Sequence, residues 1–175
     1  MVKKMKKLIL IMFLIILSGC FKSTPTKEVE NYFTNYQINK TDINDDIIDF
    51  TNYSQEQKEE YLKIIRKNYN DLIYTIKDEE INANKAIVTI EIEVYDYSKA
   101  IKESLEYKNN NLFEFMNDDY YNESKFIDYK IKKLKEVNER IKYTLDIPLS
   151  KINDKWYIDD LNKETLEKIN GIYNY

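Results

Sequence analysis

Apolar side chains occupy every second position from residue 86 to residue 94, and no other feature of the sequence constrains the fold as much. The apolar positions are Ala86, Val88, Ile90, Ile92 and Val94. Because successive side chains of a strand project to opposite faces, the pattern predicts a strand with one buried and one solvated face. That arrangement is typical of antiparallel sheets. We therefore expect a half-buried antiparallel hairpin here.

The residues before this strand supply the other arm of the hairpin. Leu72, Tyr74 and Ile76 again take every second position, and the Asn-Ala-Asn sequence at residues 82–84 predicts a turn. The first hairpin is therefore expected to span residues 72–94.

A second hairpin is predicted near the C-terminus. Residues 141–149 alternate strictly, residues 153–154 supply a polar turn, and residues 155–161 return with Trp156 pointing inward. Pro148 cannot donate a hydrogen bond to a neighbouring strand, so we expect an edge or a bulge at this position.

Five stretches with the 3.6-residue period of a helix surround these hairpins. Residues that can cap a helix stand before four of them, at Thr24, Ser54, Ser124 and Asn162, and the fifth begins near Ser98. The order of helices and hairpins predicts an α+β fold.

The segment Ser98–Asn138 is a helical excursion between the two hairpins. Its apolar positions include Leu112 and Phe113, and a polar stretch at residues 108–111 can divide it into two helices.

The first seventeen residues have the organisation of a secretory signal peptide. Residues 1–7 carry four lysines, and residues 8–17 form an unbroken apolar run. As a helix, such a run reaches about 15 Å, roughly half of a bilayer core, so it fits a signal peptide and not a spanning helix.

The apolar run ends in Leu17, and Leu17, Ser18, Gly19 and Cys20 together resemble the lipobox of bacterial lipoproteins. The resemblance implies that a signal peptidase recognises Leu17, Ser18 and Gly19 and cleaves before Cys20, whose thiol accepts a diacylglyceryl group. Two or three acyl chains then hold a protein stably on the membrane. The alternative is an ordinary signal peptide, or an uncleaved anchor, with a cysteine nearby by chance.

This resemblance divides the chain into three parts. They are a signal peptide (1–19), a lipidated cysteine with its tether (20–24) and a single α+β domain (25–175). The membrane is then a partner through the lipid on Cys20, and the domain is expected on the extracytoplasmic face of the cell membrane.

The charge of the chain argues against nucleic acid as a partner. The net charge of −4 becomes −8 once the four lysines of residues 1–19 are removed. Binding to nucleic acid requires clustered Lys or Arg to neutralise phosphates, and adhesion to anionic lipid headgroups has the same requirement.

The absence of histidine restricts the chemistry further. Histidine is the commonest general base and metal ligand, and the chain has none. Cys20 is the only cysteine, so one chain can form neither a disulfide nor a thiolate metal site. We expect no cofactor, no metal and no catalytic residues.

Residues 38–53 are polar and acidic, and they predict a loop or a short helix. Their oxygen-bearing side chains include Asp42, Asn44, Asp46 and Asp49. The segment begins like a calcium-binding loop, but Ile47 replaces the glycine of the sharp turn and Tyr53 replaces the bidentate glutamate. We expect a solvated acidic loop.

The order of elements, ending in Asn153-Asp154-Lys155-Trp156-Tyr157-Ile158, resembles the nuclear transport factor 2-like (cystatin-like) fold. The resemblance covers about residues 25–161 and implies N-terminal helices packed on a curved antiparallel sheet that forms a cone. The helical excursion departs from that pattern, and as an insertion it would cover or replace the cone-shaped pocket.

Carboxylates beside phenols can carry isomerase chemistry within such a fold. Asp118-Asp119-Tyr120-Tyr121 has this composition, but its residues are adjacent at an expected helix end, where capping and packing explain them. Asp159 and Asp160 are expected to place negative charge at the start of the last helix.

Many of the sixteen tyrosines fall on predicted core faces. They include Tyr32, Tyr36, Tyr61, Tyr69, Tyr74 and Tyr143. Tyrosine can line a ligand cavity, but at helical and strand spacing it is more often part of the core, and we expect the same of Trp156.

Two functions from different classes remain. The first is a non-catalytic binding or interaction module at the cell envelope, whose partner is a protein, a peptide or a small ligand. The second is an envelope enzyme of the isomerase or hydrolase type, which requires a buried carboxyl group near a tyrosine hydroxyl. The missing histidine and the absence of a catalytic motif favour the first.

Overall fold

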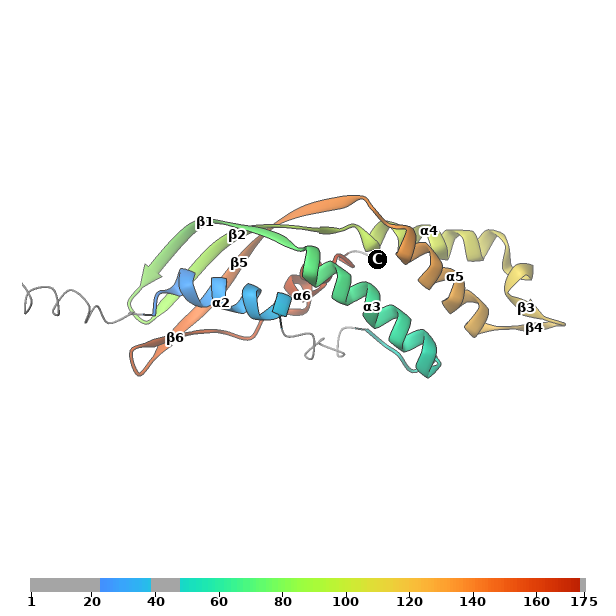
Figure 1. Cartoon of the computed structure of the whole chain (residues 1–175), viewed down its shortest axis with the longest axis horizontal. Coiled ribbons are helices and arrows are strands. Elements are labelled where there is room, and N and C mark those ends of the chain that lie inside the picture. Colours follow the sequence, from blue (N-terminus) through green and yellow to red (C-terminus); the bar gives the residue numbers. More distant parts are fainter. Residues whose placement is uncertain (1–22, 39–47, 174–175) are drawn as a thin grey trace, which may run out of the picture.

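A four-stranded antiparallel sheet, a short separate hairpin and five helices make up the residues that this computed structural model describes, 23–38 and 48–173 (Figure 1). The helices are α2 (Pro25–Ile38), α3 (Gln55–Asp71), α4 (Tyr97–Asn110), α5 (Glu123–Glu136) and α6 (Lys163–Asn170), with a 3₁₀ turn, η2 (Leu112–Phe115), after α4. The sheet has the order β1 (Ile73–Asn82), β2 (Lys85–Tyr95), β5 (Arg140–Ile152), β6 (Lys155–Ile158). The separate hairpin pairs β3 (Met116–Asn117) with β4 (Tyr120–Tyr121). The α+β class, with a helical excursion between two hairpins, is confirmed.

One face of the sheet is buried under α2. The five apolar residues that alternate along β2 are at most 4% exposed. Leu145, Ile147 and Leu149 continue the same buried layer on β5. Val29 and Phe33 of α2 belong to this core and have no exposed surface. The predicted alternation between a buried and a solvated face is therefore confirmed.

Both hairpins turn where the sequence predicts. In the second, Ile152 pairs with Lys155, and Asn153 and Asp154 between them have positive φ angles of 50° and 62°. Asn and Asp adopt this left-handed conformation more readily than most residues. In the first hairpin Ala83 takes the positive φ, at 53°.

Pro148 lies at no bulge, but β5 does reach an edge there on one side, because β6 pairs only with Leu149–Ile152 of β5. β5 is an inner strand, and it pairs with β2 in continuous register, with Pro148 opposite Ile87. The carbonyl of Pro148 accepts the N–H of Asp159 at 2.9 Å, just beyond the end of β6. In antiparallel pairing the N–H and C=O of one residue point to the same neighbour. The missing donor of Pro148 therefore faces the end of β6 and removes no bond to β2.

Helices α3, α4 and α5 form a bundle beyond one end of the sheet (Figure 1). Of the two helices that precede the sheet, α2 packs on its face, whereas α3 lies mainly against α5. The bundle has its own core, which includes Tyr61, Ile65, Tyr97, Ile101, Ile127, Ile131 and Leu134. The described part of the chain thus holds two apolar cores, one under the sheet and one in the bundle.

Asn68 of α3 joins the two cores through hydrogen bonds. Its side chain has no exposed surface. The Nδ2 group donates to the carbonyl of Ile169 at 2.9 Å, and Oδ1 accepts the backbone N–H of Tyr95 at 3.1 Å. A buried polar group needs such partners, so Asn68 fixes α3 to β2 and to the end of α6.

Tyr69 extends this polar joint to α2. Its hydroxyl donates to Oδ1 of Asn170 at 2.7 Å and accepts the hydroxyl proton of Tyr36 at 2.9 Å. Burial, and then the neighbouring Tyr69, raise the pKa of Tyr36 well above its usual range. The phenol of Tyr36 therefore stays neutral, and both hydroxyls act as structural hydrogen-bonding groups.

Two details of the helical excursion differ from the predictions. Helix α5 begins after Asn122, whose side chain accepts the N–H of Lys125 at 3.2 Å, so Asn122 and not Ser124 is the N-cap. Leu112 and Phe113 are exposed instead of lying on an apolar helix face, because α4 ends before them and they fall in η2.

Candidate functional site

The described part of the chain begins at Ser23, which is already fixed to the sheet. The Ser23 hydroxyl donates to a carboxylate oxygen of Glu28 at 2.8 Å. Its oxygen accepts the N–H of Trp156 in β6 at 3.4 Å. The predicted lipobox, residues 17–20, lies outside the described residues. Only residues 21 and 22 separate it from Ser23.

Glu79 of β1 caps the first turn of α2. Its carboxylate accepts the N–H of Thr26 at 2.8 Å and the hydroxyl of Thr26 at 2.6 Å. The first N–H groups of a helix lack partners within it, and the helix dipole favours negative charge there. Thr24 serves as the predicted cap, because its hydroxyl accepts the N–H of Lys27 at 3.1 Å. These contacts hold the start of α2 against the sheet.

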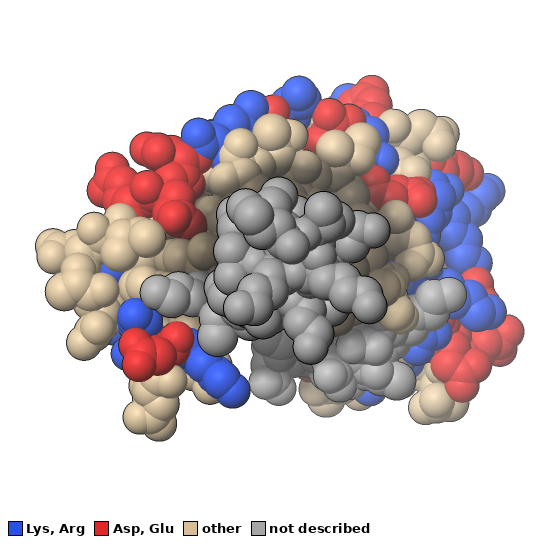
Figure 2. All heavy atoms as spheres, turned by 60° about the vertical axis from the view of Figure 1, so that its left-hand side comes forward, with Lys and Arg blue, Asp and Glu red and all other residues tan. Residues whose placement is uncertain are grey.

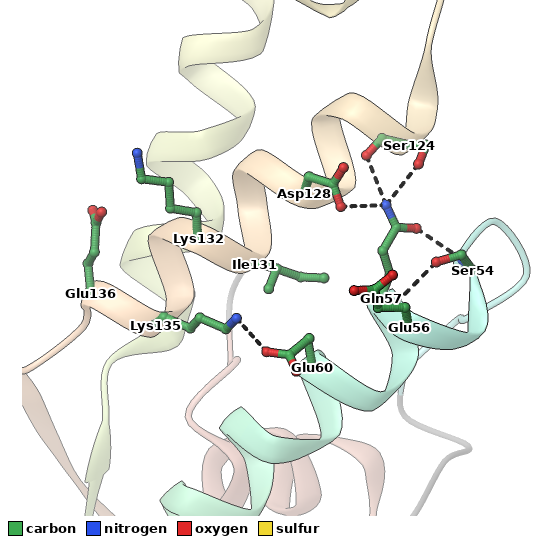
Figure 3. Close-up of a pocket in the computed structure, with 10 residues that line it drawn as sticks. All are labelled: Ser54, Glu56, Gln57, Glu60, Ser124, Asp128, Ile131, Lys132, Lys135 and Glu136. Carbon is green, nitrogen blue, oxygen red and sulfur yellow. Dashed lines mark hydrogen bonds and ion pairs between the residues drawn. The ribbon is translucent and has the colours of Figure 1, made fainter.

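A polar groove of about 570 Å³ lies between α3 and α5 (Figure 3). Its walls include Gln57 and Glu60 from α3 and Ser124, Asp128, Ile131 and Lys135 from α5. The α3 wall carries carboxylates and the α5 wall carries both carboxylates and lysines, so the groove suits polar groups better than an apolar ligand.

Gln57 ties the two walls of the groove together (Figure 3). Its Nε2 group lies 2.7 Å from Oδ1 of Asp128 and 2.9 Å from Oγ of Ser124. Its Oε1 accepts the N–H of Ser54 at 3.0 Å, within the capping box that the sequence predicts. Because both ends of the amide have protein partners, Gln57 sets the spacing of α3 and α5 and offers little to a ligand.

Glu60 accepts from lysines on both sides. Its carboxylate contacts Lys135 of α5 and Lys63 of its own helix. The hydrogen bond from Lys135, and then that from Lys63, lower the pKa of Glu60 to about 2. All three side chains are partly solvated, and pairs of this kind contribute little to stability.

Between α4 and α5, four large apolar side chains of η2 and β4 are exposed, and we call them the aromatic tip. Phe113 and Tyr120 are 72% and 80% exposed, and Leu112 and Tyr121 are 49% and 41% exposed. The antiparallel pairing of β3 with β4 closes this segment. In Figure 1 the tip lies at the opposite end of the long axis from the start of α2.

Asp118-Asp119-Tyr120-Tyr121 lies within this tip, in the turn and second strand of the β3–β4 hairpin and not at a helix end. Asp118 has a positive φ of 51°, and all four residues are exposed. They do not converge on a pocket. The structure therefore gives these carboxylates and phenols no catalytic arrangement.

The other predicted positions have structural explanations. Each of the six tyrosines packs in or against one of the two cores, as does Trp156, which confirms their expected place. Asp159 does not lie in the first turn of α6, and its carboxylate accepts from Ser150 and contacts Lys85. Asp159 thus ties β6 to the rest of the sheet, which corrects the prediction of a helix-capping charge. Asp160 is exposed and lies ahead of the N-cap of α6.

The residues of the expected acidic loop, which begins like a calcium-binding loop, lie mostly outside the described residues. Of these, Asp49 is described, and hydrogen bonds from the hydroxyl and N–H of Thr51 hold the pKa of its carboxyl below the usual range. Within residues 23–38 and 48–173, no group of carboxylates could hold a metal ion.

Pairs of tyrosine and carboxylate lie at the surface. The hydroxyl of Tyr95 donates to Asp71 at 2.8 Å, and that of Tyr107 donates to Glu114 at 3.0 Å. Every aspartate and glutamate in the described part of the chain is exposed or half-exposed. None of these carboxyl groups has the buried environment that raises a pKa for general acid catalysis.

Comparison with known proteins gives one distant match. No protein-family model matches the sequence, and no curated protein is significantly similar to it. Among solved structures, the chain is similar to a "putative lipoprotein" from Bacillus subtilis, with a TM-score of 0.45 and 12% sequence identity. The match covers 87% of this chain and 48% of that one, so this chain spans less than half of that protein.

Among the described helices, none combines the length and the apolar character that crossing a membrane requires.

Proposed function

We propose that this protein is an exported lipoprotein, anchored by lipid on Cys20, whose domain is a non-catalytic binding module at the extracytoplasmic face of the cell membrane. The observation that carries the proposal is the coincidence of three features. A basic segment, an apolar run of signal-peptide length and Leu17-Ser18-Gly19-Cys20 follow one another, and Cys20 is the only cysteine of the chain.

The position of Ser23 supports an anchor immediately before the domain. Residues 21 and 22 alone connect Cys20 to a residue that bonds to the sheet. Fully extended, two residues span about 7 Å. A lipid on Cys20 therefore holds the end of the domain where α2 begins close to the membrane surface.

Electrostatic adhesion adds little to this attachment. Without residues 1–19 the chain has a net charge of −8. Figure 2 views the molecule from the end where α2 begins, and acidic and basic side chains are interspersed on this surface. Anionic headgroups attract clustered Lys and Arg, so the lipid itself provides most of the binding energy.

Membrane labelling tests the anchor. The full chain is produced in a bacterium that processes lipoproteins and is fed an alkyne analogue of palmitate, beside Cys20→Ala and the matched control Ser23→Ala. We expect lipid label and the mature size for the wild type and Ser23→Ala. Cys20→Ala should be unlabelled and should retain residues 1–19. Label or full maturation of Cys20→Ala would refute the anchor.

The non-catalytic role is supported by the surface position of the carboxylates. An acid–base site of the tyrosine–carboxylate type needs a buried carboxyl with a raised pKa. The described aspartates and glutamates are exposed or half-exposed, and the chain has no histidine. We therefore propose binding of an envelope protein, peptide or small ligand. Turnover in a broad screen of hydrolase and isomerase substrates would contradict this role.

We also propose that α2 and the four-stranded sheet correspond to the helix-on-sheet unit of the nuclear transport factor 2-like fold. The burial of Val29 and Phe33 against the sheet supports this correspondence. The same two side chains occupy the inner face of the sheet, where that fold has its pocket. The polar groove and the aromatic tip are therefore the better candidates for a binding surface.

A further inference from the structure

We propose that the aromatic tip docks on a protein partner that presents lysines or arginines around apolar side chains. This inference rests on the proposed binding role, but it does not depend on the lipid anchor. Four large apolar side chains are exposed within one short segment. Exposed apolar clusters of this kind are typical of interaction sites.

The aromatic tip is held in one conformation by hydrogen bonds at its base. The N–H of Asn122 donates to the carbonyl of Phe115 at 2.7 Å, and Nζ of Lys125 donates to the carbonyl of Met116 at 2.7 Å. A surface that is already ordered loses less conformational entropy when a partner binds.

A packed layer of rings supports the tip from below. Phe115 meets Phe126 and Tyr129 edge-on, with ring centroids 5.6 and 5.5 Å apart, and Tyr107 stacks on Tyr129 at 4.9 Å. Phe115 and Phe126 are buried. These inner rings already form the apolar core of the region. The fold therefore does not require the exposed side chains of the aromatic tip to be apolar.

The charge around the tip indicates the chemistry of the partner. Residues 109–123 contain four carboxylates and no lysine or arginine. The carboxylates belong to Glu114, Asp118, Asp119 and Glu123. The nearby Lys108 lies over the rings of Phe126 and Tyr121, at 4.5 and 5.7 Å from their centroids. Exposed aromatic rings with several carboxylates nearby in the chain attract cationic side chains through both charge and cation–π contacts.

The same charge disfavours two other occupants. Anionic lipid headgroups would be repelled by the four carboxylates, and the tip lies opposite the end where α2 begins (Figure 1). Two copies joined tip to tip would bring like charges together, which is unfavourable. A cationic, partly apolar protein surface is the occupant that satisfies both the rings and the carboxylates.

Binding of a defined peptide tests the proposal. The protein purified from the producing bacterium, whatever its N-terminal form, is studied in the presence of phosphatidylcholine nanodiscs, and the anisotropy of a labelled peptide with alternating Arg and Leu is measured. We expect binding that weakens about tenfold in the double variant Phe113→Ser with Tyr120→Ser, because aromatic anchors dominate such interfaces. Asp118→Asn with Asp119→Asn should weaken binding at low salt and reduce its salt dependence.

Matched controls make the result specific. Tyr157→Ser removes a ring that is 50% exposed on β6, outside the tip, and should leave binding unchanged. A peptide with Glu in place of Arg should not bind. Equal binding of that peptide, or undiminished binding by the tip variant, overturns the proposal. Tip-dependent binding to phosphatidylglycerol vesicles, or tip-dependent dimerisation in sedimentation equilibrium, overturns it as well.

Crosslinking in the native host separates this inference from the proposed function. A benzophenone side chain is introduced in place of Phe113 at the tip, Lys132 beside the groove or Tyr157 on β6. We expect protein adducts from position 113 alone. Adducts only from the other positions would refute the aromatic tip and leave the binding role intact, whereas the absence of adducts from every position would refute a protein partner at all three surfaces.

Discussion

The carboxylate of Glu79 in β1 accepts both the N–H and the hydroxyl of Thr26 in the first turn of α2, at 2.8 and 2.6 Å. Thr26 follows Ser23 by three residues, and the hydroxyl oxygen of Ser23 accepts a hydrogen bond from the N–H of Trp156 in β6. The two edge strands of the sheet thus hold the start of the domain from both sides, at the position where we propose that the anchor begins.

Removing this cap should loosen the first turn of α2. We expect Glu79→Ala to speed amide hydrogen exchange at Thr26 and to lower the free energy of unfolding by about 0.5 kcal/mol, the scale of a charge at a helix N-terminus. Glu80→Ala, the exposed neighbour on the same strand, should have little effect. Equal effects of the two substitutions would show that the contact does not stabilise α2.

The buried amide of Asn68 should matter far more. Asn68→Ala leaves the N–H of Tyr95 and the carbonyl of Ile169 without their partner in a buried region. An unsatisfied buried group costs about 1–3 kcal/mol, so we expect a loss of roughly 2–4 kcal/mol in urea denaturation. Asn70→Ala, at an exposed position of the same helix, should change stability by less than about 0.5 kcal/mol. A small loss for Asn68→Ala would contradict the role of this joint.

Gln57 should control the docking of α3 on α5. Gln57→Ala removes its hydrogen bonds to Ser124, Asp128 and Ser54, and we expect a loss of about 1–2 kcal/mol. Glu56→Ala, which changes the adjacent exposed residue, serves as the control. Hydrogen exchange should show the opening at the start of α5 as well as in α3. Loosening of α3 alone would mean that Gln57 acts only in its own capping box.

The buried phenols predict a loss of stability at alkaline pH. The pKa of Tyr36 is raised from 10.0 by burial and by Tyr69. A raised folded-state pKa contributes stability that is fully present below the unfolded value and is lost as pH rises above it. We therefore expect the urea midpoint to fall above about pH 10, and to fall less steeply in Tyr36→Phe. The exposed Tyr157→Phe should keep the wild-type slope.

The parts of the fold that are determined locally could be predicted from the sequence. The alternation along residues 86–94, the turn at Asn153-Asp154 and the capping box of Ser54 and Gln57 each depend on neighbouring residues. Their hydrogen bonds and burial follow from the period of a strand or from the first turn of a helix. The structure has all three where the sequence places them.

The parts that depend on distant residues could not be predicted. Nothing near Asn68 in the sequence indicates that it meets Ile169, and Pro148 is tolerated in an inner strand only because β6 ends beside it. The pattern also assigned Leu112 and Phe113 to an apolar helix face, although the chain leaves the helix before them. In each case tertiary contacts, and not local periodicity, decide the outcome.

The proposed anchor is tested most directly by the mass of the mature N-terminus. The protein is purified from membranes of a lipoprotein-processing bacterium, digested, and its N-terminal peptide is analysed by mass spectrometry. We predict a peptide that begins at Cys20 and carries a diacylglyceryl group on the thiol. A peptide that begins at Met1, or at any residue other than Cys20, or an unmodified Cys20, would contradict the account.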